Sequence, residues 1–291
     1  MKKIYFDYAS TSPVDPLVIK AMEPYFSQAF GNPSSPHALG REANKALEES
    51  REKVARLIGA VPEEIIFNSG ATEGNNHVLE EIIPSLKREA NHVIVSSIEH
   101  HSVLEPIESL RAKGFNITFC PVDPEGLVNV DHLRKAMSEK TGFIAVMHAS
   151  NEIGALQPIR EIGQLARERK ILFLADACQT IGHIPVNVKD FACDFLSFSA
   201  HKFYGPKGVG ALYVRRGVNI APYFRGGDQE RGRRASTQNV AGAVGLAKAL
   251  EIGHSQMGQE AAEQVKWRNR LLREVPKLID GVKVNGHLTN R

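Results

Sequence analysis

Residues 195–202 read FLSFSAHK, an apolar run that ends in serine, alanine, histidine and lysine, and residues 203–208 continue as FYGPKG. The apolar part has the composition of a buried strand, and the glycine–proline turn ends it. Lys202 therefore stands at the mouth of a strand, just after Ser199 and His201. A lysine in this setting suits carbonyl chemistry, because its amine can form a Schiff base.

A second apolar run, residues 171–175 (ILFLA), leads into Asp176 and Gln179. A carboxylate at that strand end can keep a pyridine nitrogen protonated, and Gln179 can donate a hydrogen bond to a ring hydroxyl. Together with Lys202, these residues point to pyridoxal phosphate (PLP) as the cofactor. Taken singly, each also has a structural interpretation: Asp176 caps a turn, Lys202 lies in solvent and His201 packs against its neighbours.

Two further segments supply candidate contacts for such a cofactor. Residues 68–76 (NSGATEGNN) follow a strand and open a helix, so backbone amides and the Thr72 hydroxyl can bind a phosphate. The segment lacks the Gly-Lys-Ser/Thr ending of a nucleotide P-loop, and an ordinary helix N-cap is the alternative. His100 follows another strand and can stack on a flat ring, although a lone histidine is often structural.

Seven short apolar segments alternate with helical stretches between residues 64 and 214. This pattern predicts an α/β fold with a mainly parallel seven-stranded sheet and helices on both faces. Ligands bind beyond the carboxyl ends of the strands in such sheets, which is where the candidate residues fall. The expected strands are 64–67, 93–96, 117–121, 143–148, 171–175, 194–198 and 210–214.

Outside this region we expect helices over 43–58 and 240–278, the latter with a buried stripe of Ala241, Val244, Leu246 and Leu250, and a further strand at 282–284. The organisation predicted is an N-terminal arm (1–20), a cofactor-binding large domain (21–250), and a helix with the start of a small domain (251–291).

The composition excludes several classes of protein. The 36 basic and 33 acidic residues nearly balance, which argues against a nucleic-acid or membrane surface. The N-terminus has no apolar signal-peptide core, and no apolar run reaches the ~18 residues of a membrane span. A Rossmann dehydrogenase is disfavoured because no Gly-x-Gly-x-x-Gly follows the first strand.

The cysteine content indicates a reducing compartment. Cys120, Cys178 and Cys193 are odd in number and widely spaced, which fits neither a disulfide framework nor a zinc site. We therefore expect a cytoplasmic protein without a metal. Cys178 lies on the turn between Asp176 and Gln179, and it is expected to point away from the site into apolar packing.

With these residues in order, the chain resembles the cysteine desulfurases of the class V aminotransferase family, whose large domain has the PLP-dependent transferase fold type I. The resemblance extends from Tyr5 to about Ala247. It is carried by residues 6–11 (FDYAST), 31–37 (GNPSSPH), 69–73 (SGATE), 99–100 (EH), 151–154 (NEIG), 176–179 (DACQ) and 197–202 (SFSAHK). Seven ordered motifs make it specific.

The resemblance implies a role for each matched residue. Lys202 would bind the cofactor as a Schiff base, Asp176 would hold the pyridine nitrogen, and His100 would stack on the ring, these three acting in catalysis. Gln179 would contact the ring oxygen. The remaining contacts implied are the phosphate ligands Ala71, Thr72, Ser199 and His201, and Asn151 near the ring oxygen and the substrate carboxylate.

The resemblance also implies a homodimer, in which Thr237 would reach the phosphate bound by the partner subunit. Thr237 ends residues 234–237 (RAST), where the family usually reads Arg-Ser-Gly-Thr. A serine at the glycine position should constrain this loop, because serine lacks the conformational freedom of glycine.

The activity implied is conversion of L-cysteine to L-alanine, with sulfur passed to an enzyme thiol for iron–sulfur cluster or thio-cofactor synthesis and a sulfur-acceptor or scaffold protein as partner. The alternatives are a class V aminotransferase, a selenocysteine lyase and a non-catalytic PLP-binding dimer. Family members continue past the position of Arg291 into a small domain with the sulfur-accepting cysteine and a carboxylate-binding arginine. We therefore expect the 291-residue chain alone to release little sulfide.

Overall fold

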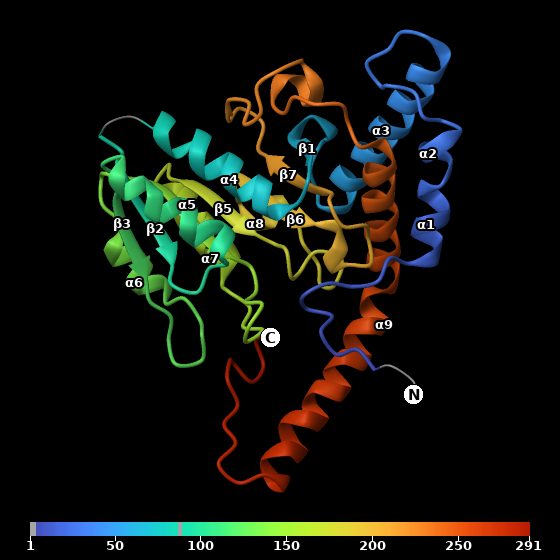
Figure 1. Ribbon diagram of the computed structural model, residues 1–291. Helices are drawn as coiled ribbons and strands as arrows, with labels where there is room; N and C mark the ends of the chain where they lie inside the picture. Colours follow the sequence, from blue (N-terminus) through green and yellow to red (C-terminus); the bar gives the residue numbers. More distant parts are fainter. Residues whose placement is uncertain (1–3, 87–88) are drawn as a thin grey trace.

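The computed structural model describes residues 4–86 and 89–291 and contains a seven-stranded sheet with helices on both faces (Figure 1). The order of strands in the sheet is β1-β7-β6-β5-β4-β2-β3. Strand β7 is antiparallel to both of its neighbours, and all other neighbours pair in parallel. The mainly parallel α/β sheet expected from the sequence is thus confirmed. The strands are β1 Ile65–Asn68, β2 His92–Ser96, β3 Asn116–Cys120, β4 Thr141–Met147, β5 Leu172–Asp176, β6 Phe195–Ser199 and β7 Gly210–Val214.

All seven expected strands form, with bounds within two residues of those predicted. Every residue of β4, β6 and β7 is buried, which explains why these segments are mostly apolar without a polar residue at every second position. The expected strand at 282–284 is wrong. These residues are exposed and pair with no strand among the described residues, and a lone extended segment gains no ladder hydrogen bonds.

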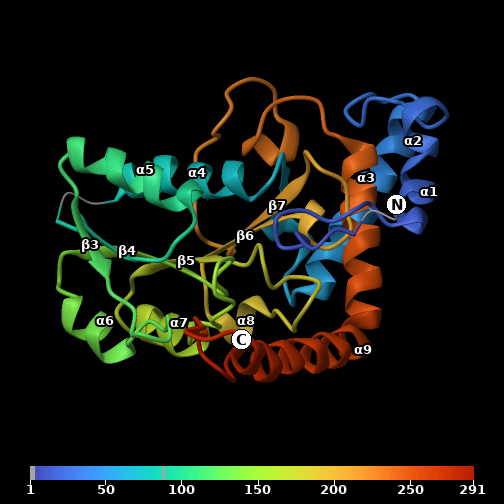
Figure 2. The ribbon, with the colours of Figure 1, turned by 60° about the horizontal axis from the view of Figure 1, so that its bottom comes forward.

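The helices form two layers. Helices α4 and α5 cover one face of the sheet, and α6, α7 and α8 cover the other (Figure 2). Helices α1 and α3, from the N-terminal part of the sequence, pack against α9 from its C-terminal part. The helices are α1 Pro16–Met22, α2 Pro24–Ser27, α3 Ala38–Leu57, α4 Ala71–Glu81, α5 His101–Ala112, α6 Val130–Ala136, α7 Ile159–Glu168, α8 Val188–Phe191 and α9 Val240–Leu278.

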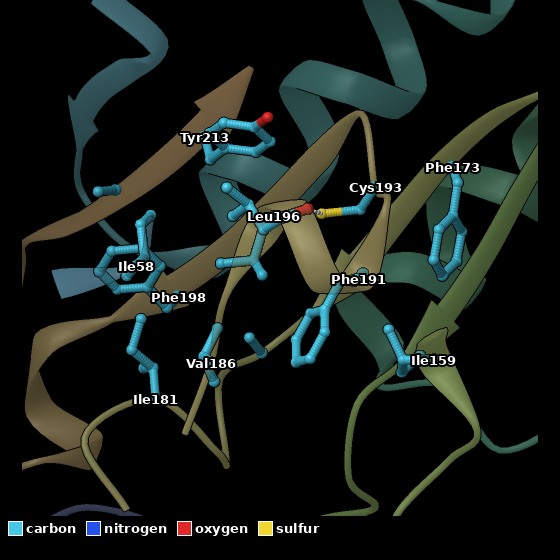
Figure 3. Close-up of a cluster of buried hydrophobic side chains, with 14 of the residues drawn as sticks. Ile58, Ile159, Phe173, Ile181, Val186, Phe191, Cys193, Leu196, Phe198 and Tyr213 are labelled. Atoms are coloured by element: carbon cyan, nitrogen blue, oxygen red, sulfur yellow. Dashed lines mark hydrogen bonds between the residues drawn. The ribbon is translucent and has the colours of Figure 1, made fainter. Parts of the chain in front are cut away.

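The larger apolar core lies between the sheet and the α7–α8 layer (Figure 3). Phe173 and Phe198 from the sheet pack in one cluster with Ile159 of α7 and Phe191 of α8. Burial of one such side chain stabilises the fold by about 1.5–3 kcal/mol. The sheet is therefore a rigid base for the loops at its edge.

Helix α9 matches its predicted bounds and runs through the domain boundary expected at residue 250. Its buried residues end at Leu250, and the remainder extends away from the sheet (Figure 1). Within the predicted stripe, Ala241, Leu246 and Leu250 are buried and Val244 is half-buried. No helix of the described residues combines the length and apolar character that crossing a membrane requires.

Candidate active site

A cavity of about 490 Å³ opens at the carboxyl edge of the sheet. Strands β1, β2, β4, β5 and β6 run in the same direction, so the segments that follow them meet at this edge. The structure brings together nine of the ten predicted site residues as lining of this cavity, all except Thr237: Ala71, Thr72, His100, Asn151, Asp176, Gln179, Ser199, His201 and Lys202.

The amine of Lys202 lies against the N-terminal arm. Its Nζ donates to the carbonyl oxygens of Ala9 at 2.7 Å and Ser10 at 2.9 Å. The side-chain amide of Gln179 donates to the same Ala9 carbonyl at 3.1 Å. Residues of the arm thus form part of the cavity wall, and the Ala9 carbonyl accepts hydrogen bonds from both side chains.

The first turn of α4 faces the cavity with its backbone donors. Ser199 Oγ accepts from the Ala71 amide at 2.7 Å. Within the described residues, the amides of Thr72 and Glu73 have no hydrogen-bond partner. Gly70 has a φ of +150°, and a Cβ there would stand 3.1 Å from Ser199 Oγ. The turn therefore has both the donors and the close backbone approach that an anion needs.

Asp176 ends β5 as a buried carboxylate with two donors. Its Oδ1 accepts from the Cys178 amide at 2.9 Å, and its Oδ2 accepts from Asn75 Nδ2 at 2.8 Å. Burial raises the pKa of Asp176, while these two donors and the charge of Lys202 oppose the rise. A cation placed beside this carboxylate would compensate for its burial.

The imidazole of His201 and the side-chain amide of Asn151 each have a hydrogen-bond partner nearby. His201 Nδ1 lies 3.1 Å from Thr11 Oγ1 in the arm. Burial, together with Lys202 and Lys207, lowers the pKa of His201 and favours its neutral form. Asn151 donates to Glu152 Oε1 at 2.9 Å, and both side chains line the cavity.

Cys178 differs from the expectation drawn from sequence. It is half-buried and lines the cavity, so the expectation that it points away into apolar packing is wrong. The alternation of a regular strand does not hold here, because β5 ends at Asp176 and a turn follows. Burial and the Asp176 charge raise the pKa of the Cys178 thiol to about 12. Cys120 and Cys193 are buried.

Thr237 lies outside this cavity, in a separate hollow of about 150 Å³ that Ser236 and Arg234 also line. Ser236 has a φ of +97°, in the region that favours glycine. The serine thus occupies the backbone conformation for which the family's glycine is suited.

The sequence assigned no role to several residues of the site, although Asp7, Asn75 and Glu99 lie in the quoted segments. Asp7 and Ser102 line the cavity, and Asn75 lies beneath it in contact with Asp176. Glu99 is buried under the same edge. Asn75 could have been found as a polar residue on the apolar face of its helix. Ser102 carries no comparable signal, because a serine after a histidine pair is ordinary in sequence.

Comparisons with known proteins agree with this geometry. A family profile described as aminotransferase class-V matches residues 4–289. A curated relative, the cysteine desulfurase IscS of Dictyoglomus turgidum, is 49% identical over 290 residues, which cover 100% of this chain and 74% of the relative.

Two solved structures share the fold. A NifS-like protein has a TM-score of 0.93 at 40% identity, over 95% of this chain and 76% of that protein. SspA in complex with cysteine has a TM-score of 0.83 at 39% identity, over 86% of this chain and 72% of that protein. The family profile and the curated relative cover almost the whole chain, and the chain belongs to the cysteine desulfurases of the class V aminotransferase family.

Proposed function

We propose that this chain is a PLP-dependent cysteine desulfurase, in which L-cysteine and a thiol give L-alanine and a persulfide. The substrate C–S bond breaks, and the sulfur forms an S–S bond with the accepting thiol. The observation that carries the proposal is the meeting of nine predicted cofactor contacts in one cavity. The relatives named cysteine desulfurase, and the one solved in complex with cysteine, support the choice of substrate.

The cavity suits PLP at both ends. The backbone amides of Thr72 and Glu73, with the hydroxyl of Ser199 and the ring of His201, would hold the phosphate. At the other end, the buried carboxylate of Asp176 would accept a hydrogen bond from the protonated pyridine nitrogen. Its raised pKa marks a site where a cationic partner is favourable.

When bound, PLP supplies an electron sink for the bonds at the substrate Cα. Lys202 would bind it covalently through Nζ, after leaving the Ala9 and Ser10 carbonyls, and would move a proton at Cα. His100 would stack on the ring, and Gln179 would contact the ring oxygen. Asn151 would lie near the substrate carboxylate.

The accepting thiol is proposed to lie outside the three cysteines of this chain. Cys120 and Cys193 are buried, and Cys178 has a pKa of about 12, so none supplies a thiolate at neutral pH. The reduced state of these cysteines suits the cytoplasm, where we place the protein.

We further propose a homodimer. Leu17, Phe26 and Phe30 near the N-terminus are 58%, 67% and 62% exposed, and a second copy would cover such apolar side chains. In this dimer Thr237 would complete the phosphate site of the partner subunit.

The test is chemical labelling of the lysine. Borohydride reduction of PLP-loaded protein, followed by peptide mapping, should place the pyridoxyl group on Lys202. Lys202→Ala should abolish the label, and Lys189→Ala, at an exposed position on α8, should leave it unchanged. In separate, unreduced PLP-loaded protein, added L-cysteine should change the cofactor absorbance and, with dithiothreitol as thiol, yield alanine. A label on another lysine, or no response to L-cysteine, would refute the proposal.

A further inference from the structure

A buried chain of hydrogen bonds joins His100 to Asp176 through two residues that the matched roles leave out. Asn75 of α4 is fully buried and donates from Nδ2 to Asp176 Oδ2 at 2.8 Å and to Ser102 Oγ at 3.0 Å. Its Oδ1 accepts from the Ser197 hydroxyl at 2.5 Å. Because Asp176 as a carboxylate can only accept, the orientation of the Asn75 amide is determined.

The other end of the chain determines where His100 carries its proton. The backbone amide of Ser102 donates to His100 Nδ1 at 3.1 Å, and a backbone N–H cannot accept. Ser102 Oγ lies 2.8 Å from the same nitrogen. Because this nitrogen already accepts from the amide, the Ser102 hydroxyl donates to it, while the hydroxyl oxygen accepts from Asn75. Nδ1 is therefore an acceptor, and neutral His100 carries its proton on Nε2.

We propose that Asn75 and Ser102 are positioning residues, which hold His100 as the neutral Nε2–H tautomer and tie it to Asp176. This inference rests on the proposed function, in which His100 and Asp176 contact the same cofactor ring. Within the described residues no hydrogen bond reaches Nε2, and His100 lines the cavity. The N–H at Nε2 is then the group that His100 presents to the cavity, where it can donate a hydrogen bond.

The tautomer can be read without cofactor or activity. Two-bond ¹H–¹⁵N spectra of histidine-labelled, cofactor-free protein distinguish the two neutral forms, and His100→Gln assigns the signal. The wild type should show the Nε2–H form alone. Ser102→Ala removes the hydroxyl donor and keeps the backbone N–H, so the Nε2–H form should stay the major one while a minor Nδ1–H signal appears. Ser109→Ala, whose hydroxyl bonds Pro106 on the same helix, should change nothing.

A second variant tests the Asn75 end. Asn75→Asp replaces the donor at Nδ2 by an acceptor, so the Ser102 proton should turn toward position 75 and the same minor signal should appear. If this variant does not fold, as judged by circular dichroism, Ser102→Ala decides alone. An Nδ1–H tautomer in the wild type, or an unchanged single tautomer in folded Ser102→Ala, would overturn the proposal.

The loaded protein provides a further readout. Formation of alanine from L-cysteine with dithiothreitol should slow about tenfold in Ser102→Ala, a part of what a positioned acid–base group contributes. Failure of the Lys202 labelling would refute the proposed function and leave the tautomer result standing. Labelling of Lys202 together with an unchanged single tautomer in the variants would refute only the role of Asn75 and Ser102.

Discussion

Glu99 is a carboxyl group buried beneath the cavity. Its Oε1 accepts from the Ser96 hydroxyl and from the Met147 amide at 2.7 Å. Oε2 has no partner among the described residues. Burial, with the nearby charge of Asp176, raises the pKa of Glu99 to about 8 against these two donors. At neutral pH Glu99 is thus mostly protonated, whereas both oxygens of Asp176 accept hydrogen bonds, which favours its carboxylate form.

This pKa sets a pH dependence of stability. The folded state keeps a proton on Glu99 that the unfolded state loses near pH 4.5, so the free energy of unfolding should fall as pH rises from about 5 to 8. The contribution from Glu99 is roughly 1 kcal/mol per pH unit. Glu99→Gln keeps an oxygen for both donors and should flatten this slope, as measured by urea unfolding. An equal slope in the variant would contradict the assignment.

Asp176 should respond differently to substitution. In Asp176→Asn the new amide must turn its Nδ2 toward Asn75 Nδ2 or the Cys178 amide, so two donors face each other. We expect a loss of about 1–3 kcal/mol in the free energy of unfolding. Cα-proton exchange of L-alanine, followed by NMR in D₂O, should fall on the order of 10²-fold. Asp190→Asn, at an exposed site, is the control, and unchanged exchange in Asp176→Asn would contradict its role.

At the scale of elements, the loop 225–239 is held to the sheet by a buried ion pair. Arg51 of α3 donates to Glu230 at 2.6 and 2.9 Å, and both side chains are nearly inaccessible. Glu230 also accepts from the Phe67 amide of β1 at 2.9 Å. Glu230 and Arg231 both have positive φ, a conformation that costs energy for residues with a Cβ. The ion pair between Arg51 and Glu230 stabilises the loop in this conformation.

Ser236 in the same loop predicts a stabilising substitution. Its φ of +97° is costly for a residue with a Cβ and accessible to glycine. Ser236→Gly should raise the free energy of unfolding by about 1 kcal/mol, the lower end of such backbone strain. Thermal unfolding gives the measurement, and Ser34→Gly in an exposed turn without positive φ serves as control. A less stable Ser236→Gly would show that the loop bears no strain at this position.

At the scale of the whole molecule, the proposed dimer predicts complementation between two defective chains. Thr237→Ala protein should bind PLP weakly, and Lys202→Ala protein should take no covalent label. In a mixed dimer, Lys202 of the Thr237→Ala chain lies at the same site as Thr237 of the Lys202→Ala chain. One intact site should therefore form per dimer. Borohydride labelling at limiting PLP should recover toward wild type in the mixture. No recovery, with mixed dimers present by native mass spectrometry, would contradict a shared site.

Much of this architecture could be predicted from the sequence. Residues 143–147 are apolar without alternation, and residues 195–198 are apolar except for Ser197, which is the pattern of parallel strands buried on both faces. Polar residues directly after such strands must meet at one edge, so the amino-acid sequence alone is enough to group His100, Asp176 and Lys202.

The contacts around these residues required the tertiary structure. Ala9 and Ser10 bind Lys202 from 193 and 192 positions away, and Asn75 reaches Asp176 across 101 positions. Residues 282–284 have the composition of a strand and pair with no strand among the described residues. Local patterns determine which elements form, because propensity and burial act along neighbouring residues. The choice of hydrogen-bond partners, and hence the proton on His100 and the direction of Cys178, depends on distances between elements that only packing sets.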